Sequence, residues 1–255
     1  MWAARRRLFY ISCVVLFFLS IAIVIYAVYV YKPPTCFDGI QNNAEEGIDC
    51  GGGCQLVCSF SVTDLNVRWA RAFEVGAGVY NFAAVIENPN LDKKTVIPYY
   101  FRAYDEDNLL ITETFGSVEL DPAEITAVFE PSVSTGTRKI DRVFIEFDTQ
   151  AQWIFSERID PPLISDGFSI ASTDSFPRLE ATVRNMTNEP VRGATIVAIL
   201  YDENDNVYQS SRTFVDYIAA QDRARAYFTW RKPFEEKIKS VDIFIEPAGS
   251  TGILE

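Results

Sequence analysis

Hydrophobic and polar residues follow two different patterns along the chain. An uncharged apolar run covers residues 8–31, and as a helix it would span roughly 36 Å, more than the ~30 Å hydrocarbon core of a bilayer. After residue 59, apolar and polar residues alternate, for example over residues 65–69 and 143–147. Turn residues separate these runs, and a period of two between turns is typical of β-strands. The pattern predicts a membrane helix followed by an all-β region.

The charges beside the apolar run predict the orientation of the helix. Arginine occupies positions 5–7, and Lys32 is the basic residue that directly follows the run. Cytoplasmic flanks of membrane helices are enriched in Lys and Arg, so we expect the N-terminal tip inside and everything after the helix outside the membrane. The alternative is a signal peptide cleaved near Ala22. Because the apolar run continues nine residues past Ala22, the pattern favours an uncleaved anchor.

Composition narrows the function classes. The 255 residues carry a net charge of −12 and include no histidine. An acidic chain is a poor match for nucleic acid, and a chain without histidine has no Ser-His or Cys-His nucleophile pair and no imidazole metal site. The nucleophile elbow, the P-loop and the zinc-protease motif are missing as well. We therefore expect no catalytic activity and name no catalytic residue.

Four of the five cysteines lie in the segment after the helix. They are Cys36, Cys50, Cys54 and Cys58. In an exported segment too short to have a core, this density predicts two disulfides, and three pairings are open. A zinc site with four thiolates is the alternative, but the spacing lacks the C-x2-C pairs of such sites.

Oxygen-bearing side chains are dense in the same segment. Asp38, Asn42, Glu45 and Asp49 are interleaved with glycines, and Ca²⁺ binds six to eight oxygen ligands from flexible loops of this composition. The order of these residues differs from the EF-hand loop, and ordinary turn residues of a disulfide loop are the alternative. Calcium is thus a candidate cofactor, with these four residues as candidate ligands.

The cysteine segment resembles a known small motif. From Cys36 to Cys54 it reads C-x-D-G-x-x-N-x-x-E-x-x-x-D-C-G-G-x-C. This is similar to a cysteine motif in stalks and multidomain surface proteins of bacteria and some eukaryotes. The resemblance implies an exported structural module rather than an activity.

The all-β region contains two similar stretches at an offset of 97 residues. Residues 84–88 (AVIEN) correspond to 181–185 (ATVRN), and Tyr-Asp-Glu occurs at 104–106 and again at 201–203. Two tandem β-sandwiches of immunoglobulin or fibronectin type III shape would bury the alternating apolar residues between their sheets. The predicted parts are a cytoplasmic tip (1–7), a transmembrane anchor (8–31), a cysteine-rich module (33–58), a first sandwich (59–149), a second sandwich (150–247) and a C-terminal tail (248–255).

The second stretch resembles the FxLYD type of exported β-sandwich, which is related in shape to late-embryogenesis-abundant type 2 domains. It has a V-x-N strand end at Asn185 and a Leu-Tyr-Asp sequence at residues 200–202. The first stretch departs from this pattern, because Ala103 precedes its Tyr-Asp, and neither stretch has the hairpin glycine. Together with the anchor and the cysteine motif, the chain is similar to bacterial single-pass envelope proteins whose domains are regarded as binding or structural modules.

Tyr99 and Tyr100 are the candidate contact residues for a partner. Consecutive aromatics on one strand point to opposite faces, so at least one ring should face outward, and exposed tyrosine is common in protein interfaces. Cover by the neighbouring domain is the alternative. We expect a membrane-anchored extracytoplasmic binding or adhesion module whose partner is a protein or a polysaccharide. A structural subunit of a larger cell-envelope or secretion assembly is the alternative function.

Overall fold

The structure is a computed structural model that describes residues 2–30, 34–42, 44–172 and 176–248. The chain divides into two compact units, Met1–Gln55 and Leu56–Glu255.

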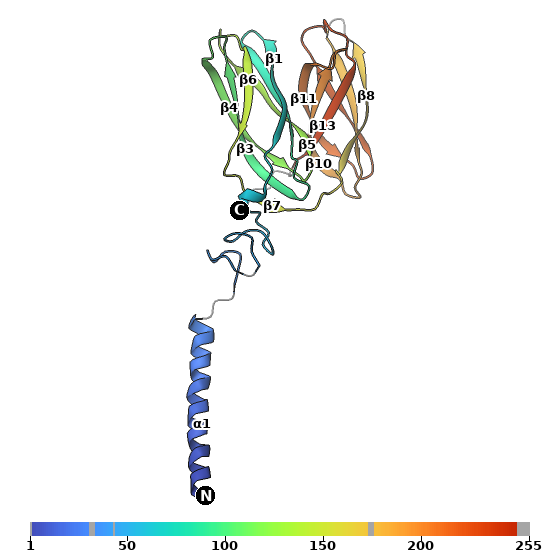
Figure 1. Cartoon of the computed structure of the whole chain (residues 1–255). Coiled ribbons are helices and arrows are strands. Elements are labelled where there is room, and N and C mark those ends of the chain that lie inside the picture. Colours follow the sequence, from blue (N-terminus) through green and yellow to red (C-terminus); the bar gives the residue numbers. More distant parts are fainter. Residues whose placement is uncertain (1, 31–33, 43, 173–175, 249–255) are drawn as a thin grey trace. The chain divides into compact units, whose positions relative to one another are not determined.

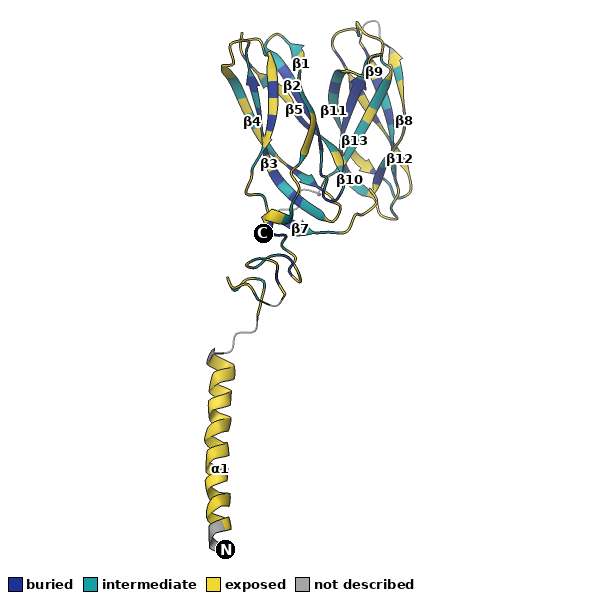
Figure 2. Cartoon of the chain, viewed as in Figure 1, coloured by how far each residue is buried: buried dark blue, intermediate teal, exposed yellow. Residues whose placement is uncertain are grey.

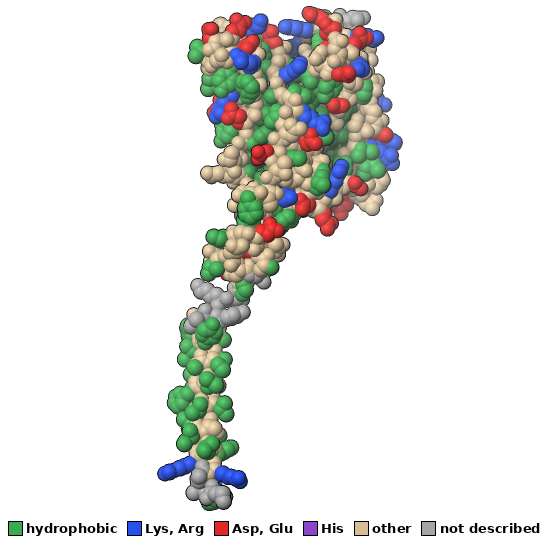
Figure 3. All heavy atoms as spheres, viewed as in Figure 1, with side chains coloured by type: hydrophobic (Ala, Val, Ile, Leu, Met, Phe, Trp, Pro, Cys, Tyr) green, Lys and Arg blue, Asp and Glu red, His purple; other side chains and the backbone are tan. Residues whose placement is uncertain are grey.

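The first unit begins with a long exposed helix. Helix α1 (Trp2–Ile25) continues in π-helical geometry over Tyr26–Val30, and its described side chains are exposed (Figure 2). The stretch Arg5–Tyr29 has a mean hydropathy of 2.9, with Lys and Arg side chains at one end and apolar ones along its length (Figure 3). The hydroxyls of Ser12 and Ser20 donate to helix carbonyls one turn earlier, so neither needs water. The helix is long and apolar enough to span a membrane.

The second unit is built of antiparallel strands (Figure 1). In its first sandwich, the sheets β1-β2-β5 and β4-β3-β6 face each other, and β7 pairs with the start of β3. The pairing of β7 carries the first sandwich past residue 149, where the sequence placed its end. The strands are β1 (Asn66–Gly76), β2 (Val79–Glu87), β3 (Lys93–Tyr104), β4 (Leu110–Leu120), β5 (Ile125–Ser134), β6 (Arg142–Phe147) and β7 (Trp153–Phe155).

The second sandwich repeats the strand order of the first. Its sheets are β8-β9-β12 and β10 flanked by β11 and β13, which correspond one by one to β1-β2-β5 and to β3 flanked by β4 and β6. The predicted all-β class with two β-sandwiches is confirmed. The strands are β8 (Leu163–Ser172), β9 (Arg178–Asn185), β10 (Val191–Tyr201), β11 (Val207–Ile218), β12 (Arg223–Thr229) and β13 (Ser240–Pro247).

The two sandwiches share a third core, which we call the joint core. Besides one core inside each sandwich, a cluster of Phe73, Ala83, Val85, Phe129, Val197, Ile199 and Val207 connects sheet β1-β2-β5 to sheet β11-β10-β13. The four sheets therefore stack as four layers. Strands β2 and β10 are covered on both faces, and residues 82–86 and 196–200 are all buried. Strands buried on both faces need apolar residues at successive positions, which explains their unbroken apolar runs.

Two buried asparagines fix the ends of the central strands. Asn88 after β2 and Asn185 at the end of β9 are both 0% exposed. Each side-chain amide donates to backbone carbonyls, and each Oδ1 accepts the N–H of the residue two positions on. Since buried polar groups are stable only when they are hydrogen-bonded, these contacts make asparagine specific at both positions.

Candidate functional site

The cysteine-rich module is the first candidate site. Cys36 and Cys54 form a disulfide, and Cys50 and Cys58 are also disulfide-bonded. Cys13, exposed on α1, is the free cysteine. The prediction that the four cysteines of the module form disulfides is confirmed, and the thiolates that a zinc site needs are therefore absent from them.

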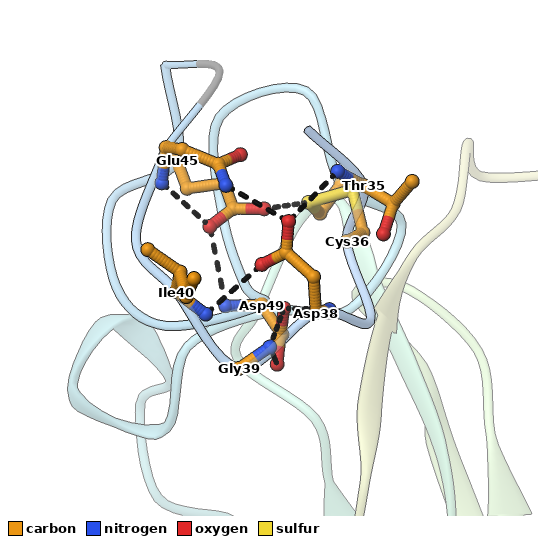
Figure 4. Close-up of a disulfide and its surroundings, with 9 residues drawn as sticks. Thr35, Cys36, Asp38, Gly39, Ile40, Glu45 and Asp49 are labelled. Carbon is orange, nitrogen blue, oxygen red and sulfur yellow. Dashed lines mark hydrogen bonds between the residues drawn. A yellow bond between two sulfur atoms is a disulfide. The ribbon is translucent and has the colours of Figure 1, made fainter. Parts of the chain in front are cut away.

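Three carboxylates of the module accept hydrogen bonds from its own loop (Figure 4). Asp49 accepts from the backbone N–H groups of Asp38 and Gly39, at 2.9 Å each. Asp38 accepts from the N–H of Ile40 at 2.9 Å and from the side-chain amide of Asn42 at 2.9 Å. These bonds satisfy backbone donors that no secondary structure pairs, so the carboxylates organise the loop.

Glu45 is the most buried of the three carboxylates. It is 8% exposed, and its Oε2 accepts from the N–H groups of Asn42 and Asp49 at 3.2 and 3.3 Å. Its Oε1 lies 3.3 Å from the Sγ of Cys54. One ligand atom each from Cys36, Glu45 and Cys54 lies within 4.8 Å of the others, but disulfide sulfurs are not thiolate ligands. This trio therefore does not form a metal site while the disulfide is intact.

The four predicted calcium ligands are brought together in this loop. Asp38, Asn42, Glu45 and Asp49 all take part in the network above, which gives each a structural role through N–H donors. Calcium binding by them stays a prediction. The structure also gives a physical reason for the glycine at position 52 of the motif, because Gly52 has a φ of +59° and a Cβ there would lie 1.9 Å from the carbonyl oxygen of Ala44.

The two tyrosines predicted to contact a partner point to opposite sides of β3. Tyr99 is 6% exposed within the first core, and its hydroxyl donates to Glu130 at 2.7 Å. Burial and this bond raise the pKa of Tyr99 above its usual range. Gly116 stands opposite on β4, where a Cβ would come within 2.4 Å of the Tyr99 hydroxyl. The interpretation of Tyr99 as a partner contact is therefore wrong, because its ring fills the core.

Tyr100 belongs to an aromatic surface on the outer side of sheet β4-β3-β6, which we call the open aromatic face. It consists of Tyr100, Arg102, Tyr104, Phe115 and Phe144. Phe115 pairs across the strands with Tyr100, and Phe144 pairs with Arg102. Phe115 is 75% exposed and Phe144 49%, and the ring of Phe144 meets Tyr104 edge to face at 5.9 Å.

Arg102 lies at the centre of this face. Its guanidinium donates to Glu113 at 2.6 Å and to Glu146, on the two flanking strands, and it lies 5.8 Å from the ring centre of Tyr100. The hydrogen bond to Glu113 is the largest cause of a raised pKa at Arg102, and the bond to Glu146 raises the pKa further. The two carboxylates hold the arginine in the plane of the face. The surface therefore offers aromatic rings around a fixed cation flanked by hydrogen-bond acceptors.

The equivalent sheet of the second sandwich is covered by the first sandwich. Sheet β11-β10-β13 corresponds to β4-β3-β6, and it packs through the joint core on sheet β1-β2-β5. Arg71 donates to the carbonyl of Val207 at 2.8 Å, and Arg212 donates to that of Phe129 at 3.2 Å. Within this chain, the same sheet is thus used for docking in one sandwich and exposes aromatic rings in the other.

Comparison with known proteins assigns no family. No family model and no curated protein matches the chain, so the resemblances of its cysteine motif and its β-sandwiches remain predictions. Among solved structures, a red sea bream transglutaminase matches 73% of the chain at 13% identity with a TM-score of 0.27. A Bacteroides uniformis β-glucuronidase matches 68% at 11% identity with a TM-score of 0.25. The chain spans 29% and 25% of these two proteins.

A third similar structure is a tandem carbohydrate-binding domain, CBM22-1-CBM22-2, of Paenibacillus barcinonensis Xyn10C. It matches 78% of the chain and 91% of its own length at 9% identity, with a TM-score of 0.15. Likeness at this level transfers no function to the chain.

Proposed function

We propose that the protein is a membrane-anchored binding module whose open aromatic face docks a protein partner outside the membrane. The observation that carries the proposal is the exposure of Phe115 and Phe144 beside Tyr100 and Arg102 on one sheet face. Tyrosine and arginine, with phenylalanine, are enriched at the centres of protein interfaces, where a few such residues supply most of the affinity.

The docking of the equivalent sheet inside the chain supports a protein, rather than a polysaccharide, as the partner. Sheet β11-β10-β13 already packs on another β-sheet through apolar side chains and arginine-to-carbonyl bonds. By the same geometry, a partner with a flat sheet of its own would fit the face of β4-β3-β6. Such a contact buries the rings of Phe115 and Phe144, which are otherwise left in water.

In this proposal, helix α1 anchors the protein and the cysteine-rich module links the helix to the sandwiches. In this proposal α1 spans the membrane with its arginines on the cytoplasmic side, as the charge bias of its flanks favours. Along the chain, the disulfide-bonded module lies between the helix and the sandwiches, and its covalent bonds keep a segment without a core of its own folded. No step of this mechanism requires catalysis.

Site-specific photo-cross-linking in the native membrane tests the proposal. A photoreactive amino acid at position 115 of the full-length protein should give one adduct with a protein partner. The matched control is position 168, because Phe168 is also an exposed phenylalanine (47%) but lies on β8 in the second sandwich. The substitution Phe144→Ala should weaken capture at position 115 about thirtyfold, the loss of a 2 kcal/mol interface anchor.

The outcomes separate this function from its alternative. Equal capture at positions 115 and 168, or none at either, would refute docking through the open aromatic face. An adduct found only within a stoichiometric complex that co-purifies from detergent would favour the structural subunit of a larger assembly. A single partner that the protein binds and releases would favour the binding module.

A further inference from the structure

The stacked sheets have one uncovered outer face at each end. Within the chain, sheet β11-β10-β13 of the second sandwich docks on sheet β1-β2-β5 of the first. Among the described strands, the sheets left at the two ends are therefore β4-β3-β6 and β8-β9-β12 (Figure 2). By strand order, β4-β3-β6 corresponds to the sheet that docks, and β8-β9-β12 corresponds to the sheet that receives it. The two ends of the stack are thus the two halves of one kind of contact.

The outer side of sheet β8-β9-β12, which we call the arginine face, is positively charged. It consists of Arg178, Glu180, Arg184, Arg223, Arg225 and Tyr227, with Asp166 paired to Arg223 at its edge. Along β9 and β12 these residues alternate with residues of the second core, so their side chains lie on the other side of the sheet. The guanidinium of Arg178 lies 4.3 Å from the ring centre of Tyr227, and Arg225 pairs with Glu180 at 3.2 Å. Arginines outnumber carboxylates here, in a chain whose net charge is −12.

The open aromatic face complements the arginine face in charge and in chemistry. Its central residue, Arg102, donates to two carboxylates, Glu113 and Glu146, so the centre of this face has a negative charge in excess. The rings of Phe115 and Phe144 are exposed beside it. Guanidinium groups stack on aromatic rings and pair with carboxylates, and the open aromatic face offers both to the arginines of the other face.

The docking of one sandwich on the other shows which position of the docking sheet makes the contact. Arg212 on β11 lies with its guanidinium 5.6 Å from the ring centre of Phe129 on β5. Arg212 pairs with Val197, and Phe115 pairs with Tyr100, which lies 97 positions before Val197 in the sequence repeat. Phe115 therefore has the place in the first sandwich that Arg212 has in the second.

The same register identifies the position on the sheet that receives the contact. The residue before Phe129 pairs with Ala84 on β2, and the residue before Tyr227 pairs with Ala181 on β9, 97 positions after Ala84. Tyr227 therefore has the place of Phe129. Tyr227 is 40% exposed and Phe115 is 75% exposed, whereas Phe129 is buried in the joint core. A second docking contact like the first would cover both exposed rings.

We propose that the partner of the open aromatic face is a second copy of this chain, which presents its arginine face. This assignment rests on the proposed function and names its partner. Phe115 of one copy packs against Tyr227 of the next, and the arginines around Tyr227 meet the rings and carboxylates around Arg102. The contact is head to tail because it joins two different faces. Each pair of copies therefore keeps one face of each kind for further copies, and the assembly grows into a ring or a filament.

Photo-cross-linking of the purified full-length protein in detergent tests this assignment, because the sample contains no other protein. A photoreactive amino acid at position 115 should give an adduct of twice the monomer mass. Peptide mass spectrometry should find the attachment within β12, residues 223–229. Position 168 is again the control, because Phe168 pairs with the core residue Ala181 and so lies on the other side of the sheet from Tyr227. An attachment within β3, β4 or β6 would indicate contact between two open aromatic faces and would overturn the proposal.

Charge reversal on the arginine face supplies a variant whose effect cannot be explained by misfolding. Arg178 is exposed, so Arg178→Glu should leave the thermal midpoint unchanged. It should weaken association about tenfold in sedimentation velocity, since it replaces a stacking cation by an anion. Arg158→Glu is the matched control, because Arg158 is an exposed arginine on the segment between β7 and β8, and it should associate like the wild type. Equal association of the two variants would contradict the proposal.

Mixing two variants separates head-to-tail association from a symmetric dimer. Phe115→Ala weakens the open aromatic face, and Arg178→Glu weakens the arginine face. Each variant alone should stay largely monomeric at the concentration where half of the wild type associates. An equimolar mixture should form dimers that do not grow further, because it contains one intact contact. A mixture that stays monomeric, or a wild type that never associates, would overturn the proposal. If position 115 labels only a different protein in the native membrane, the proposed function stands and this assignment fails.

Discussion

Truncation of Ile199 should show how strongly the joint core couples the two sandwiches. Ile199 lies on β10, is 0% exposed, and belongs to the joint core. Ile199→Ala removes three carbon atoms from this contact. At about 0.8 kcal/mol for each buried carbon, the lost transfer free energy is roughly 2.4 kcal/mol, and the cavity left behind brings the total to about 3 kcal/mol.

Urea unfolding followed by tryptophan fluorescence and far-ultraviolet circular dichroism measures this loss. The wild type should unfold in one transition, because the joint core makes the two sandwiches one cooperative unit. Ile199→Ala should lower the free energy of unfolding, and Ile199→Asp, which buries an unpaired charge in the joint, should split the transition into two.

Two other isoleucines calibrate the result. Ile196 lies on the same strand and is also 0% exposed, but its side chain belongs to the core of the second sandwich, so Ile196→Ala should cost a similar amount. Ile159, between the sandwiches in sequence, is 76% exposed, and Ile159→Ala should change stability by less than about 0.5 kcal/mol. If Ile199→Ala matched the exposed control, the packing of the joint described above would be refuted.

Four further predictions concern pH, calcium, a buried asparagine and the glycosylation sequon that contains it. Burial raises the pKa of the Glu124 carboxyl from 4.5 to about 7. Between these two pH values the folded protein keeps the proton that the unfolded chain loses. The free energy of unfolding should therefore fall by on the order of 2 kcal/mol as the pH rises from 4.5 to about 7. Glu124→Gln should flatten that slope in scanning calorimetry, and an unchanged slope would contradict the assignment. Because the module's carboxylates already accept N–H donors, we expect its disulfides to resist reductant equally in EDTA and in calcium; faster reduction in EDTA would show that calcium contributes. Asn185→Ala should cost about 3 kcal/mol in urea unfolding, since it leaves buried carbonyls without their donor. The same buried amide should keep the Asn185-Met186-Thr187 sequon free of glycan in the folded protein, which mass spectrometry of the intact chain would check.

The alternation of apolar and polar residues predicts the strands and also which side chains of a strand face the core. Along β3, Ile97, Tyr99, Phe101 and Ala103 share one parity and are all buried. That parity alone places Tyr99 in the core and Tyr100 outside. The partners of Tyr100 on the open aromatic face, Phe115 and Phe144, depend on strand register, which a single sequence does not fix.

The joint core has a sequence signal that is easily mistaken for ordinary burial. Residues 82–86 and 196–200 are unbroken apolar runs, which show that β2 and β10 are covered on both faces but not by what. In the module, the aspartates and glycines were predicted as turn residues or ligands, and the direction of their hydrogen bonds required the structure.

The joint core has a consequence for the order in which the chain is made. The first sandwich is synthesised completely before β10, β11 and β13 exist, so Phe73, Val85 and Phe129 have no cover during that interval. A nascent chain in this state exposes an apolar sheet surface that can associate with neighbouring chains, and with a second nascent copy in particular. A chaperone that shields this surface until the last strand arrives would raise the yield of the folded protein, and translation stalled between the sandwiches would lower it.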